Sequence, residues 1–203
     1  KSKDPLLLAF LNQFSNYGKK KINKLALYHQ KNFKDVIILG TGGSSKAGRT
    51  FVQIAYRTFG RNPKLPQITF LENIDFQDFN DLFKKINLKK TGIIVISKSG
   101  ETNETLVQFL IFLSKYRKNF EKKKMQRYFT VITKKGNSSL RNLANDFSID
   151  IIDLDSNLSG RFSAFSPVGL LPAAISGLDI TKIRKGALSL INEFLKKKCD
   201  LFA

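Results

Sequence analysis

Short apolar runs alternate with segments of helical spacing through the middle of the chain. The clearest run lies at 93–96, where four consecutive residues are β-branched. A parallel strand that is covered on both faces needs no polar alternation, so such a run predicts a buried strand. The same pattern predicts strands at 36–39, 67–71, 93–96, 128–133 and 149–154.

Helical spacing occupies the intervals between these strands and continues after the last one. It predicts helices at 45–59, 76–86, 102–116, 139–145, 167–175 and 183–197. Asp75 is expected to cap the second of these helices. The segment 5–29 predicts one or two helices with a break near Gly18.

Strands separated by helices at this spacing form right-handed βαβ units and a parallel sheet. The expected fold is a three-layer α/β/α domain with a five-stranded parallel sheet in the flavodoxin-like order 2-1-3-4-5. We expect this domain to occupy 31–180, after an N-terminal helical segment at 1–30 and before a C-terminal helix at 181–203.

Composition narrows the class of protein. The chain has 203 residues, 42% of them hydrophobic, which suffices for one domain with a substantial core. No apolar run reaches the length of a membrane span. Cys199 is the only cysteine, so an internal disulfide is excluded and a cytoplasmic location is expected.

The formal net charge of +19 suggests nucleic-acid binding as one interpretation. The lysines, however, are scattered over helix ends and loops, and no recognition helix, zinc-ligand spacing or RNA-binding aromatic motif accompanies them. We therefore expect no specific nucleic-acid binding. The charge would still attract anionic substrates.

A hydroxyl-rich turn at 97–102 joins the 93–96 strand to the next helix. Such a turn points backbone N–H groups and the positive end of a helix dipole at one place, which suits a phosphate. Ser97, Ser99 and Thr102 can donate further hydrogen bonds, and Lys98 adds charge. The alternative is an ordinary N-cap, with Ser99 or Thr102 capping and Glu101 or Glu104 completing a capping box.

A glycine-rich turn at 40–45 follows the first strand and opens a helix. It has neither the dinucleotide spacing nor a Walker lysine pattern. In the expected sheet order, the first and third strands are neighbours, so the 40–45 and 97–102 turns flank the switch point where ligands bind. Both turns are therefore predicted to face one crevice.

The stretch at 157–167 follows the fifth strand and carries Arg161. A guanidinium is always charged and can stabilise an oxyanion or a second phosphate oxygen. The alternative is a loop salt bridge from Arg161 to Asp153 or Asp155.

Together the three stretches resemble the glucose-6-phosphate isomerase (phosphoglucose isomerase) family, in the bacterial type of the first of its two sugar-isomerase (SIS) domains. The resemblance covers about 35–180 and rests on the 42–44 turn, the 97–105 loop and the 160–174 signature. It implies substrate binding by residues of all three stretches, namely Gly43, Ser44, Ser97, Lys98, Ser99, Thr102 and Gly160.

The same resemblance implies a division of roles. The 97–102 loop would hold the 6-phosphate, and Gly43 and Ser44 would contact the sugar end. Arg161 would stabilise the developing enediolate, and Glu104 would order the site. The implied reaction interconverts glucose 6-phosphate and fructose 6-phosphate without a metal or organic cofactor, in a homodimer when the protein is complete.

Groups that could move a proton are lacking. Isomerisation through an enediol needs a base between C1 and C2 and an acid/base for ring opening. In the family these come from a later glutamate, histidine and lysine that this chain does not contain. Glu101 and Glu104 stand at a helix N-terminus, where the dipole lowers carboxylate basicity. A surface or structural role is expected for His29, the only histidine.

We therefore expect these 203 residues to be an inactive half of an enzyme. A second interpretation is a non-enzymatic SIS module that binds a phosphosugar and regulates a partner. That module would explain the 97–102 loop equally well, but it gives no reason for the 160–174 signature.

Overall fold

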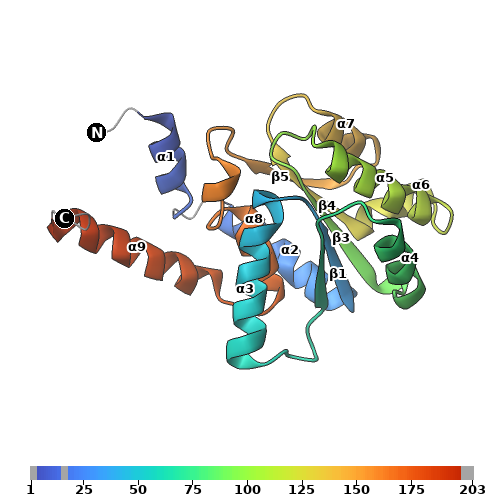
Figure 1. The fold of residues 1–203 in the computed structure, drawn as a ribbon, viewed down its shortest axis with the longest axis horizontal. Coiled ribbons are helices and arrows are strands. Elements are labelled where there is room, and N and C mark those ends of the chain that lie inside the picture. The colour runs from blue at the N-terminus through green and yellow to red at the C-terminus, as the bar shows by residue number, and fades with distance from the viewer. Residues whose placement is uncertain (1–3, 15–17, 198–203) are drawn as a thin grey trace.

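The predicted strands form one parallel sheet in the computed structural model, which describes residues 4–14 and 18–197 (Figure 1). The strands are β1 (Asp35–Leu39), β2 (Gln67–Leu71), β3 (Thr91–Ile96), β4 (Phe129–Lys134) and β5 (Asp150–Leu154). Their order is β2-β1-β3-β4-β5, and each neighbouring pair is parallel. The predicted order is thereby confirmed.

Helices cover both faces of the sheet (Figure 1). One face carries α2 (Lys19–Asn32), α3 (Gly43–Phe59) and α8 (Pro167–Ile175), and the other carries α4 (Phe76–Lys85), α5 (Asn103–Arg117) and α7 (Ser139–Asp146). Alternate side chains of β1 enter different cores: Val36 and Ile38 pack with the first group, Ile37 and Leu39 with the second. This two-sided burial explains why the strand sequences show no polar alternation.

Two further helices lie at the edge of the molecule away from the sheet (Figure 1). They are α1 (Pro5–Asn12) and α9 (Ile180–Lys197). The 5–29 segment therefore contains α1 and most of α2. Residues 15–17, beside the predicted break at Gly18, lie outside the described residues, as does Cys199. Among the described helices, none is long and apolar enough to cross a bilayer.

Element ends differ from the predictions where a local cap decides them. Helix α3 begins at Gly43 rather than Ser45, because Gly42 takes a positive φ of 54° just before it. Helix α9 begins at Ile180 rather than at 183, because the Asp179 carboxylate accepts backbone N–H bonds from the first turn. Asp75 caps α4 as predicted.

Four short elements were not predicted: η1 (Leu88–Lys90), α6 (Lys122–Met125), η2 (Gln126–Tyr128) and η3 (Gly160–Phe162). Each is a single turn, too short to show a hydrophobic period. Of these, η3 carries Arg161.

Candidate functional site

Three hydroxyl groups meet in the 97–102 loop, between β3 and α5. Ser97 Oγ lies 3.0 Å from Thr102 Oγ1 and 3.5 Å from Ser99 Oγ. The Ser99 and Thr102 oxygens are 3.4 Å apart. This cluster stands at the N-terminus of α5, where the helix dipole favours an anion.

Backbone hydrogen bonds fix the path of this loop. Lys98 O accepts from Lys134 N at 3.1 Å, and Gly100 O accepts from Leu140 N at 3.0 Å, so β4 and α7 hold it. Gly100 has a φ of +72°, and a Cβ there would collide with the Ser138 side chain. The loop therefore requires glycine at this position.

The capping-box alternative for this turn is wrong in the described structure. Thr102 precedes α5 but makes no side-chain cap bond. Ser99 Oγ accepts from Glu101 N at 3.1 Å, and Glu101 lies in the loop before α5 begins. The Glu101 carboxylate turns away to α7, where it accepts from both Ser139 N and Ser139 Oγ at 2.7 Å. These bonds from Ser139 lower the pKa of Glu101. Glu101 is thus a poor base, as predicted, and the bonds from Ser139 at the start of α7 are the main cause.

The 40–45 turn meets the 157–167 stretch through two glycines. A Cβ on Gly43 would lie 2.7 Å from the carbonyl carbon of Gly160, so the two backbones are in direct contact. Ser44, Lys98 and Gly160 line one small cavity. The structure thus brings residues of all three stretches together at the carboxyl ends of β1 and β3, the switch point of the sheet.

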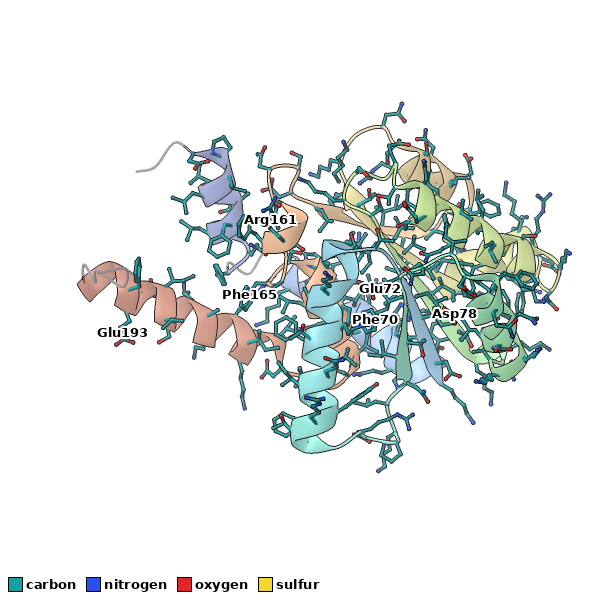
Figure 2. All side chains as sticks on the ribbon, viewed as in Figure 1. Phe70, Glu72, Asp78, Arg161, Phe165 and Glu193 are labelled. Atoms are coloured by element: carbon teal, nitrogen blue, oxygen red, sulfur yellow. The ribbon has the colours of Figure 1, made fainter. Side chains whose placement is uncertain are left out.

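Arg161 lies on η3, between α1 and α3 (Figure 2). Its side chain is exposed, and within the described chain it makes no ion pair. Asp153 is instead taken by Arg141, whose Nη2 lies 2.6 Å from Asp153 Oδ1. The salt-bridge alternative for Arg161 is therefore wrong here, and its guanidinium stays available to a ligand.

Glu104, the remaining predicted residue, and His29, the lone histidine, are not members of the hydroxyl cluster. Glu104 is exposed on the first turn of α5 and lines a second hollow with Thr41 and Gly42 of the 40–45 turn. Lys46 and Glu72 line the same hollow. His29 is fully buried, and its Nε2 lies 3.2 Å from Thr130 Oγ1 near the start of β4. Burial lowers the pKa of His29 to about 4. The structural role expected of this histidine is confirmed.

Sequence reasoning missed Glu72, which directly follows the carboxyl end of β2, on the side of the sheet where the predicted loops lie. Its carboxylate accepts a hydrogen bond from Ser45 and pairs with Arg49, both on α3. The available signal was its position: a charged residue just beyond the carboxyl end of a parallel strand lies where ligands bind. Over the described ranges, no three His, Cys, Asp or Glu side chains gather as metal ligands.

The family model for phosphoglucose isomerase matches residues 10–200 of the chain. A glucose-6-phosphate isomerase from Bacillus cytotoxicus is 31% identical over 177 residues, which are 84% of this chain and 39% of that protein. A hypothetical protein from Thermus thermophilus superposes with a TM-score of 0.78 at 26% identity, over 92% of this chain and 44% of the other.

A glucose-6-phosphate isomerase from Chlamydia trachomatis superposes with a TM-score of 0.67 at 25% identity, covering 80% of this chain and 30% of that one. The chain thus spans about two fifths of the length of the curated relatives that it matches.

Proposed function

This chain belongs to the phosphoglucose isomerase family, and we propose that it forms the sugar-phosphate-binding part of an enzyme that interconverts glucose 6-phosphate and fructose 6-phosphate. One observation carries the proposal. The Ser97, Ser99 and Thr102 hydroxyls cluster at the N-terminus of α5, in a loop that also presents Lys98 to the glycine turn of α3.

The phosphate is assigned to this cluster because it combines hydroxyl donors, a lysine and a helix N-terminus. The sugar then extends toward Gly43 and Ser44, where the lack of a side chain at Gly43 lets η3 approach the α3 backbone. Gly160 supplies backbone at that contact. The exposed Arg161 beside it would stabilise negative charge on an enediolate oxygen.

Proton transfer is assigned to groups outside this chain. His29 lies beside the amino end of β4, away from the carboxyl ends of the strands where the loops meet. Burial disfavours its protonated form by lowering its pKa. Glu101 is occupied by Ser139, and Glu104 stands on the exposed face of α5, where we assign it a role in ordering the site. We therefore propose that the chain binds the substrate but does not turn it over alone.

Two wider features belong to the same proposal. The complete enzyme is proposed to be a homodimer, and it is proposed to act in the cytoplasm without a metal or organic cofactor. Neither feature rests on a contact within this chain.

An amide NMR titration with fructose 6-phosphate tests the proposal, with fructose and inorganic phosphate as controls. We expect saturable shifts at 42–44 and 97–102, with tighter binding of the sugar phosphate than of either control. Unshifted amides at both places in a folded sample would contradict it. A coupled assay for isomerisation should read zero, and appreciable turnover would refute the assignment of proton transfer to absent groups.

A further inference from the structure

Glu72 contacts two residues that lie one turn apart on α3. The Ser45 hydroxyl donates to Glu72 Oε1, and Arg49 Nη1 lies 3.4 Å from Glu72 Oε2. The Arg49 guanidinium also lies over the Phe70 ring, 5.7 Å from its centroid. Figure 2 shows Phe70 and Glu72 beside α3. Both carboxylate oxygens are therefore committed to one helix face.

The backbone around Glu72 is held from the other side of the sheet. Gln108 of α5 is fully buried, and its Nε2 donates to Leu71 O at 3.3 Å and to Asn73 O at 3.0 Å. Glu72 thus sits between α3 and α5, the two helices whose N-termini flank the crevice. Its carboxylate has a fixed place relative to both.

The charge of Glu72 acts at the α3 end. Helix α3 has no acidic residue in its first turn, while Lys46 and Arg49 lie near its start. A helix N-terminus with two nearby cations attracts anions. The α3 end would therefore compete with the 97–102 loop for a phosphate. Glu72 and Glu104 both line the hollow at this end with Lys46, so each adds a negative charge there. Glu72 also pairs with Arg49, and it therefore reduces the attraction most.

We propose that Glu72 is a specificity-determining residue, which keeps anions from the α3 end and so directs the phosphate to the 97–102 loop. The sugar then takes the place beside Gly43 and Ser44. This inference rests on the proposed function, since it assumes that both loops face one ligand.

Inorganic phosphate is the probe, and amide NMR shifts report its binding separately at 42–45 and at 97–102. In the unmodified chain, we expect phosphate shifts at 97–102 but not at 42–45. Glu72→Gln keeps an acceptor for Ser45 but leaves Arg49 without a carboxylate. It should add saturable shifts at 42–45, with affinity there raised about tenfold, the scale of one charge-assisted hydrogen bond.

Asp78→Asn is the matched control, because it removes the same charge from an exposed side chain on α4 (Figure 2). It should behave as the unmodified chain. The proposal would be overturned if phosphate caused no amide shifts at 42–45 in Glu72→Gln, or if Asp78→Asn raised phosphate affinity there equally.

A second variant keeps the test independent of whether Glu72→Gln folds. Arg49→Gln removes the cation but leaves the Glu72 charge, so phosphate should leave 42–45 unshifted even when 97–102 is saturated. Phosphate binding at 42–45 in this variant would overturn the proposal. Failure of the proposed function would give a different result, because fructose 6-phosphate would then leave the 97–102 amides of the unmodified chain unshifted. Comparing phosphate-induced shifts at 42–45 between the unmodified chain and Glu72→Gln would still measure the effect of Glu72.

Discussion

At the scale of single residues, burial makes His29 sensitive to pH. Its ring packs against Phe33 at 5.3 Å between centroids, and its Nδ1 is buried without a hydrogen-bond partner in the described chain. Protonation would place an unpaired N–H and a charge among apolar groups. The pKa of His29 is accordingly lowered from 6.5 to about 4.

The sign of the effect on stability follows from this direction. Between pH 6.5 and about 4 the unfolded chain binds a proton at His29 and the folded chain does not. The contribution of neutral His29 to the free energy of unfolding is therefore complete above pH 6.5. It is lost as pH falls to about 4, by on the order of 3 kcal/mol. Urea unfolding of the unmodified chain and of His29→Gln from pH 7 to pH 4 measures the difference. Parallel pH profiles would contradict this prediction, because they would mean that the pKa of His29 is the same in the folded and unfolded chains.

At the scale of elements, the sequence predicts what local patterns decide. The apolar runs identify β1 to β5 because each strand packs side chains into the cores on both faces of the sheet. Asp75 marks the start of α4 because a helix cap is a local interaction. The contact of Gly43 with Gly160 and the tie from Ser45 to Glu72 join segments distant in sequence. Those contacts depend on how loops meet after folding, so no local period or cap could reveal them.

The contact between α3 and η3 gives a prediction at this scale. Gly43→Ala places a Cβ 2.7 Å from a backbone carbon of Gly160, and backbone cannot rotate away as a side chain can. We expect the free energy of unfolding to fall by about 1–3 kcal/mol, the usual range for overpacking. Urea denaturation measures the loss.

Gly160→Ala is the matched control for that contact. A Cβ on Gly160 has its nearest neighbour at 3.8 Å, an ordinary van der Waals distance. Its stability should stay within about 0.5 kcal/mol of the unmodified chain. Equal losses in the two variants would mean that helix or turn propensity, rather than the approach of α3 to η3, sets the effect.

At the scale of the whole molecule, the net charge of +19 and the 97–102 loop are expected to attract anions by different means. Scattered surface lysines attract phosphates through a screened field, with no fixed geometry. The 97–102 loop is instead proposed to hold a phosphate through hydroxyl groups in a loop whose path is fixed by hydrogen bonds to β4 and α7. Only the second kind of attraction distinguishes one phosphate ester from another.

Salt should separate these two contributions. Raising NaCl from 50 to 200 mM is expected to weaken duplex DNA binding by about a hundredfold or more, since it rests on counterion release. The same change should weaken fructose 6-phosphate binding by about threefold or less, because short hydrogen bonds to a single phosphate are screened little. Anisotropy of a labelled duplex and the NMR titration at both salt concentrations measure the two slopes. A DNA affinity that resists salt would contradict this view, since it would require a specific nucleic-acid surface among the lysines.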